Sequence, residues 1–301
     1  MALSSDALIA TLSGQLTAQA ANIAELQMQL GSGQVLTQPS DNPAAVTQVL
    51  ALSSQAAQLT SWQSNVDLAT SWLGVANGAA NSALASMQSA RSLLLQAINQ
   101  GTQNATGYEA LGTQLGGVAA NLLSLANTQF AGRAVFAGTS ASPEAYDASG
   151  TFLGTTQSPS VIVGPGAGAG QSLAVSVPGT ALFGTGAANV FATLSSAVSA
   201  LSSGAPSAAS LSSALNALDS VIAGAQGASA VLGESSQRAS SAAAALTTQI
   251  ASVQASQASL ENVNVATATT QLSLETTSYQ AALWAASQTC PSWHSPSPRS
   301  T

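Results

Sequence analysis

Residues 45–98 read AVTQVLALSSQAAQLTSWQSNVDLATSWLGVANGAANSALASMQSARSLLLQAI, and an apolar residue recurs along them at alternate steps of four and three. Twelve of the sixteen positions reached in this way are apolar. The positions are Ala45, Val49, Leu52, Ala56, Leu59, Gln63, Val66, Thr70, Leu73, Asn77, Ala80, Leu84, Met87, Arg91, Leu94 and Ile98. This spacing predicts one long helix with a continuous apolar stripe.

A second stripe of the same kind runs from Leu211 to Leu260, where twelve of the fifteen heptad positions are apolar. Proline is absent from Ala44 to Ser142 and from Ser207 to Cys290, and proline in a helix interior costs about 3 kcal/mol. Both spans therefore favour helix. Because each stripe needs a partner, we expect the two long helices to pack against each other.

The first thirty residues carry a separate heptad. Its positions are Ile9, Leu12, Leu16, Gln19, Ile23, Leu26 and Leu30. Gly31-Ser-Gly33 is a good helix end, and Asn42 followed by Pro43 is a good helix start. The C-terminal stripe breaks after Leu260 and resumes in another frame, at Val265, Ala268, Leu272, Tyr279 and Ala282. Breaks near both ends predict that the two termini form a smaller helical bundle together.

The middle of the chain differs in composition. Five prolines and a glycine-rich run at 164–170 fall there, and alternating stretches such as Leu173–Val177 favour short strands. A loop, a helix from about Tyr108 to Thr128 and a strand over Arg133–Ala137 are expected before it. The predicted fold is mainly α, a long antiparallel helical bundle or coiled coil formed by the N- and C-terminal halves, with a small β-rich insertion. The predicted segments are an N-terminal assembly helix and turn (1–42), the N-terminal half of the helical core (43–138), the insertion (139–187), the C-terminal half of the core (188–260), a C-terminal assembly helix (261–288) and a divergent tail (289–301).

Composition excludes many functions. Only 5% of the 301 residues are charged, against roughly a quarter in a typical soluble domain. Four arginines, no lysine and eleven acidic residues give a net charge of −7, which disfavours binding to nucleic acid or to an anionic membrane. One histidine and one cysteine cannot build a His/Cys metal site. We therefore expect no enzymatic activity, no cofactor and no metal.

Several stretches of the chain resemble the flagellin superfamily, and within it the hook–filament junction family. The stretches are PSDNP at 39–43, LLSLANT at 122–128, GRAVFAG at 132–138 and YQAAL at 279–283. The resemblance covers nearly the whole chain up to about Gln288. The family usually ends in an apolar tail, whereas this chain ends in a segment from Cys290 to Thr301 that holds three of its ten prolines.

The resemblance implies an extracellular structural subunit that joins the flagellar hook to the filament. It implies partners of three kinds: other copies of this chain in a ring, a neighbouring hook-associated protein together with flagellin, and an export chaperone. It also implies export through the flagellar type III channel, which agrees with the lack of an ordinary signal peptide. Terminal helices of the family pair on assembly, which predicts subunit-interface residues at Ile9, Leu12, Leu16, Ile23, Leu26, Leu30, Leu272, Tyr279 and Leu283. Two alternatives stay open: a minor flagellin that forms filament itself, and an extracellular adhesin that uses the insertion.

Overall fold

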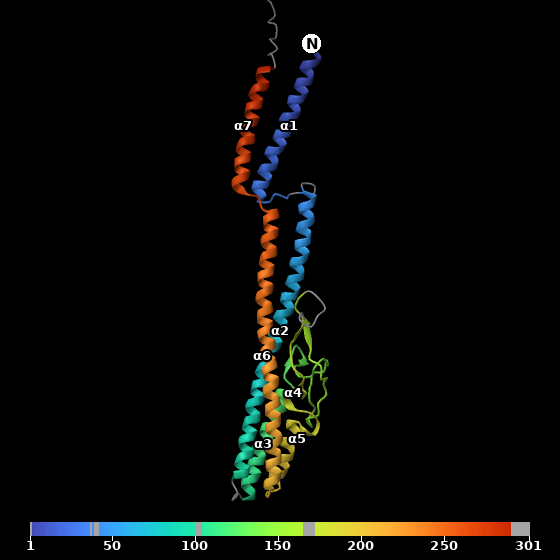
Figure 1. Ribbon diagram of the computed structural model, residues 1–301, viewed down its shortest axis with the longest axis vertical. Coiled ribbons are helices and arrows are strands. Elements are labelled where there is room, and N and C mark those ends of the chain that lie inside the picture. The colour runs from blue at the N-terminus through green and yellow to red at the C-terminus, as the bar shows by residue number, and fades with distance from the viewer. Residues whose placement is uncertain (1, 37, 39–41, 100–103, 165–171, 290–301) are drawn as a thin grey trace, which may run out of the picture. The chain divides into compact units, whose positions relative to one another are not determined.

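The computed structural model describes residues 2–36, 38, 42–99, 104–164 and 172–289, and helices dominate them (Figure 1). The helices are α1 (Ala2–Ser32), α2 (Pro43–Asn99), α3 (Ala105–Ala126), α4 (Gly179–Phe183), the 3₁₀ turn η2 (Gly186–Ala188), α5 (Val190–Ser202), α6 (Ala208–Glu261) and α7 (Val265–Thr289). The strands are β1 (Gln129–Phe130), β2 (Arg133–Ala134), β3 (Ser160–Ile162) and β4 (Ser172–Ala174). The predicted fold class, a mainly helical chain with a small β-rich insertion, is confirmed.

The chain forms two compact units. The central unit is Gln58–Ile250, and the terminal unit combines Met1–Ala57 with Ala251–Thr301. The helices α2 and α6 contribute residues to both units. No helix among the described residues is long and apolar enough to span a membrane.

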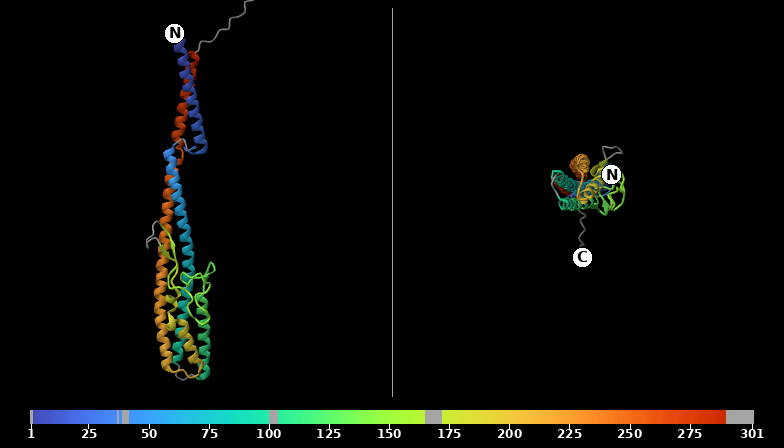
Figure 2. Two further views of the ribbon diagram at one scale, coloured as in Figure 1. Left: turned by 90° about the vertical axis from the view of Figure 1, so that its right-hand side faces the viewer. Right: turned by 90° about the horizontal axis from the view of Figure 1, so that it is seen from below.

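In the central unit α2 and α6 run side by side in opposite directions (Figures 1 and 2). Arg91 Nε lies 2.6 Å from Asp219 Oδ1, and about four turns back along α2 the amide of Asn77 donates to Ser236 Oγ over 2.9 Å. All fifteen heptad positions expected on α6 are buried or half-buried, and so are fourteen of the sixteen on α2. The predicted pairing of the two long helices is confirmed.

Two shorter helices, α3 and α5, pack against each other and cover one end of this pair (Figure 1). Gly112 of α3 permits the approach, because a Cβ there would lie 3.3 Å from Leu201 Cβ of α5. Asn121 of α3 donates to Ser86 of α2 over 3.1 Å. At this end the α2–α6 pair is therefore covered by two further helices. The contiguous hydrophobic core of the described residues lies within the central unit.

The strand expected just before the insertion is shorter than the sequence predicts. The strand expected over Arg133–Ala137 ends at Ala134, and the chain turns before Gly138, whose φ is +66°. A Cβ at Gly138 would lie 2.1 Å from the carbonyl oxygen of Thr155, so only glycine fits this turn. Phe136 is fully buried instead of lying in a ladder.

An aromatic cluster holds the insertion on the helices. Its members are Phe136, Tyr146, Phe152, Phe183 and Phe191, with ring centroids 4.9–5.8 Å apart in the contacting pairs. Contacts of this geometry add about 0.5–1.5 kcal/mol each beyond the area that they bury. Burial also raises the pKa of the Tyr146 phenol well above its usual range. Four of the chain's five phenylalanines thus belong to this cluster.

The β3–β4 hairpin lies along the two long helices and is held by both. Asn65 of α2 donates to the carbonyl of Ile162 over 2.9 Å, and Arg238 of α6 donates to the carbonyl of Ser172 over 3.4 Å. Leu173 points into the core and is fully buried. Because the side chains of Asn65 and Arg238 bond to a main-chain carbonyl on each strand, less of either strand edge is free to pair with a strand of another chain.

Replacement of Leu73 by alanine tests where the core lies. Leu73 is 1% exposed, whereas Leu68 on the same helix is 50% exposed. We expect Leu73→Ala to lower the free energy of unfolding of the central unit by about 2–5 kcal/mol, because it leaves a cavity. The matched control Leu68→Ala should cost less than about 1 kcal/mol. Urea unfolding followed by circular dichroism measures both, and equal losses would contradict the assigned core.

Candidate assembly surface

The terminal unit is built around α1 and α7, which pack side by side. Residues of both helices line one hollow: Asn22, Glu25, Leu26 and Gln29 from α1, and Gln271, Leu274 and Glu275 from α7. Higher numbers on α1 lie near lower numbers on α7, so the pair is antiparallel. The smaller bundle of the two chain ends that the sequence predicts is present in the structure.

A main-chain bridge sets the register of this pair. Val35 N donates to Glu261 O over 2.7 Å, and Val263 N donates to Gly33 O over 3.0 Å. Gly33 ends α1 with a φ of +75°, as its place after the heptad predicts. The helices that follow are capped by asparagine, since Asn42 accepts from Ala45 N and Asn264 from Thr267 N. The bridge joins segments more than two hundred residues apart in the chain.

The predicted interface residues fall largely on the seam between α1 and α7. Leu12, Leu16, Ile23, Leu26, Leu30, Leu272 and Tyr279 are half-buried there. The side chain of Ile9 lies outside the described residues, and Leu283 is exposed. Among the α1 and α7 side chains that the structure describes, only Ala268 is fully buried. The seam is therefore covered on one side only, as expected for two helices without a third.

Three large apolar side chains on the outer faces were missed by the heptad analysis. Leu274 is 71% exposed, Trp284 is 69% exposed and Met28 is 56% exposed. Val265, which the sequence places on the seam, is also exposed, because the seam of α7 begins one turn later at Ala268. The available signal was a large apolar residue off the seam in helices otherwise rich in alanine, serine and threonine. Each of these side chains is apolar and largely uncovered by the described residues.

Within 2–36, 38, 42–57 and 251–289, which are the described residues of the terminal unit, every charged residue is acidic. Its acidic residues there include Glu25, Glu261 and Glu275, and those ranges hold no lysine, arginine or histidine. Two of the glutamate carboxylates accept a hydrogen bond from a glutamine amide one turn away. Gln29 donates to Glu25, and Gln257 donates to Glu261. The exposed Leu274 lines the same hollow as two of these acidic residues, Glu25 and Glu275.

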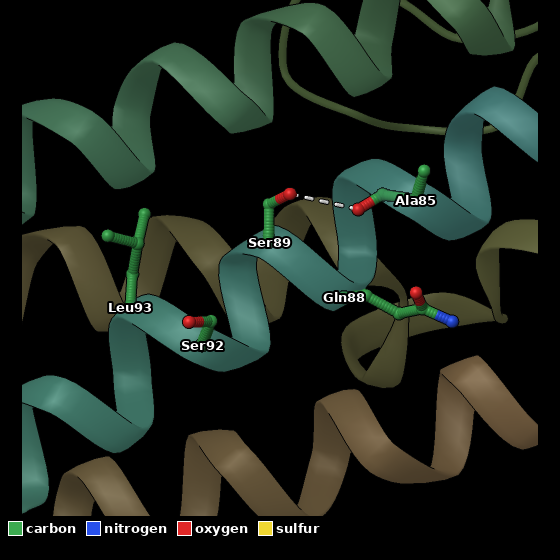
Figure 3. Close-up of a pocket in the computed structure, with 5 residues that line it drawn as sticks. All are labelled: Ala85, Gln88, Ser89, Ser92 and Leu93. Carbon is green, nitrogen blue, oxygen red and sulfur yellow. Dashed lines mark hydrogen bonds between the residues drawn. The ribbon is translucent and has the colours of Figure 1, made fainter.

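The remaining features of the described residues suggest no catalytic or metal-binding site. The hollow in Figure 3 is lined by Ala85, Gln88, Ser89, Ser92 and Leu93 from one face of α2, without an ionisable group. Arg133 lies 5.6 Å over the ring of Trp72 and donates to the carbonyl of Ser140, so it is bound within its own unit. No cluster of metal-ligating residues occurs within the described ranges. The tail with Cys290 and His294 lies outside them.

The fold defines a class of helical proteins whose N- and C-terminal segments pair with each other. Residues 4–141 match the bacterial flagellin N-terminal helical region, and residues 215–290 match the bacterial flagellin C-terminal helical region. The chain belongs to the flagellin superfamily. It is a structural component of the bacterial flagellum.

Two solved structures share the fold. A putative flagellar hook-associated protein from Vibrio parahaemolyticus is 21% identical, with a TM-score of 0.67 over 74% of this chain and 100% of that chain. FlgL from Bacillus cereus is 20% identical, with a TM-score of 0.58 over 69% of this chain and 99% of that chain. A comparison with curated protein sequences finds no match.

Two glycines at the end of α1 provide a matched test of the main-chain bridge. Gly33→Ala forces a left-handed conformation on a residue with a Cβ and should cost about 1–2 kcal/mol. Gly31→Ala lies within the helix and should stabilise it by about 0.5–1 kcal/mol. Hydrogen exchange at the amides of Val35 and Val263 should accelerate in the first variant and not in the second. The same response in both variants would mean that the bridge does not set the register.

Proposed function

We propose that this chain is a hook–filament junction subunit of the kind called hook-associated protein 3, and that copies of it assemble into a ring through residues 1–42 and 261–288. The observation that carries the proposal is the half-covered α1–α7 pair with Leu274 and Trp284 on its outer face. Such a pair has an apolar surface that only another protein can bury. Neighbouring copies of the same chain supply that cover.

Energetics support assembly at this surface. A pair of helices without a third element is marginal in water, since most helical stability in proteins comes from packing. Burying one large apolar side chain contributes about 1.5–3 kcal/mol, so covering Leu274 and Trp284 would supply part of the free energy that association requires. The central unit has its own core and does not need a partner for its fold. The terminal unit is therefore the part that changes most on assembly.

Two lines of support favour the junction over the filament. The solved structures with this fold include proteins named hook-associated protein and FlgL. The stretch GRAVFAG at 132–138 also resembles the junction family. Export without a cleaved signal peptide, and the neighbouring hook-associated protein, flagellin and chaperone as partners, follow from the same proposal. A minor flagellin remains the alternative, because the matched sequence regions are those of flagellin itself.

Acidic substitutions on the outer face test the assembly surface. Leu274→Asp and Trp284→Asp each place a charge where a neighbouring copy would exclude water, and should weaken association at least about tenfold. Leu68→Asp is the control, because Leu68 is an exposed leucine of the central unit. Sedimentation velocity of the concentrated full chain measures association, and circular dichroism checks the fold. If the control weakens association as much, the outer face of α7 is not the contact.

Electron microscopy of a deletion strain tests the place in the flagellum. A junction subunit predicts intact hooks without filaments and unpolymerised flagellin in the medium, because the filament would lack its attachment. Complementation with the full chain should restore filaments, whereas the Leu274→Asp variant should not. A normal filament in the deletion strain would rule out the junction role.

A further inference from the structure

One arginine of the central unit is held in place without an acidic partner. Arg133 lies in β2, next to the turn residues Ala131 and Gly132, and its Cζ lies 5.6 Å from the centroid of the Trp72 ring. Its Nη2 donates to the main-chain carbonyl of Ser140 over 3.1 Å. No carboxylate among the described residues forms an ion pair with it. The positive charge therefore has a fixed position and no counter-ion in that part of the chain.

The guanidinium group is open to a partner at one nitrogen. Its Nε is buried, and its Nη2 is bonded to Ser140, whereas Nη1 has no acceptor among the described residues and is not buried. The turn beside it is open as well. Ala131 and Gly132 are exposed, and a Cβ added at Gly132 would meet nothing within 4 Å. A side chain of another protein can therefore reach Nη1 without displacing a part of this chain.

The surroundings of Arg133 favour an anion. The indole Nε1 of Trp72 and the Nε of Arg133 are both buried donors without an acceptor among the described residues. They stay inside the unit, but they add positive partial charge beside the guanidinium. An ionised carboxylate is the side-chain group that suits this place, because it only accepts hydrogen bonds and pairs strongly with a guanidinium.

The same chain supplies such carboxylates. Glu109 of α3 and Glu234 of α6 are exposed, and neither side chain has a bonded partner among the described residues. Glu234 follows the buried heptad residue Leu232 by two positions, so it lies on the face of α6 turned away from α2. Arg133 is held on α2 instead, and the two charges lie on different faces of the central unit. A head-to-tail contact between identical subunits brings two such faces together at every step around a ring.

We propose that Arg133, held on Trp72, binds a carboxylate of a neighbouring copy, so that the central unit adds an ion pair to the contact made by the terminal helices. The proposal rests on the proposed function, because it takes a ring of identical subunits as given. An exposed ion pair contributes little affinity, and its main effect is on the orientation in which the copies meet. The apolar contacts of the terminal helices lack that directionality.

The test compares Arg133→Gln with Arg238→Gln in the full chain. Both variants remove one positive charge from the central unit, and in both the glutamine keeps an amide donor for the carbonyl of Ser140 or Ser172. Arg238 is the control because its side chain is exposed. Sedimentation velocity of the concentrated chain should show association about fivefold weaker in Arg133→Gln and unchanged in Arg238→Gln. Added salt should narrow the difference between Arg133→Gln and the unaltered chain, because it screens the ion pair.

A third variant, Arg133→Lys, separates charge from packing. Lysine keeps the charge, so this variant should associate more strongly than Arg133→Gln, and circular dichroism checks that each variant keeps its fold. Equal weakening by the two Arg133 variants, equal weakening by Arg238→Gln, or unchanged association in Arg133→Gln would each overturn the role of Arg133. If Leu274→Asp weakens association and Arg133→Gln does not, the proposed function stands and this inference falls. Failure of the unaltered chain to associate would overturn the proposed function itself.

Discussion

The stability of each part of this protein depends on how fully the apolar stripes of its helices are buried. A long helix in water is stable only where its apolar stripe is buried, and here the number of covering elements differs between the units. In the central unit, α3, α5 and the insertion lie over the α2–α6 pair, and side chains such as Leu94 and Leu218 are fully buried. In the terminal unit the described α1 and α7 cover each other alone. The central unit therefore has a complete core, whereas the terminal unit leaves large apolar side chains such as Leu274 and Trp284 exposed.

The insertion contributes to the core as well as to the surface. Its aromatic cluster and Leu173 are buried against the helices, and Asn65 and Arg238 hold the β3–β4 hairpin from α2 and α6. This integration weighs against the adhesin alternative, in which the insertion acts as an independent recognition module.

Sequence periodicity predicted the helices well because apolar residues recur every three or four residues along most of each stripe. The helix start at Asn42 and Pro43 and the helix end at Gly33 were also predictable, since capping depends on local chemistry. The bridge between Gly33 and Val263 was not, because pairing of distant main-chain groups leaves no periodic pattern. The exposed apolar side chains of Leu274 and Trp284 were not predicted either, because they lie outside the periodic stripe. A single stripe was sought on each helix, whereas α7 carries apolar residues on a second face.

The composition of α7 suits burial between copies. A hydroxyl removed from water costs free energy unless it keeps a hydrogen bond. Thr269, Thr270, Thr276 and Thr277 each donate to a main-chain carbonyl of their own helix, mostly four residues back. These hydroxyls need no partner from a neighbour, so the proposed contact between copies would leave none of them without a hydrogen bond. A helix rich in threonine, serine and alanine can thus be polar enough for the free chain in water and still be buried on assembly at small cost.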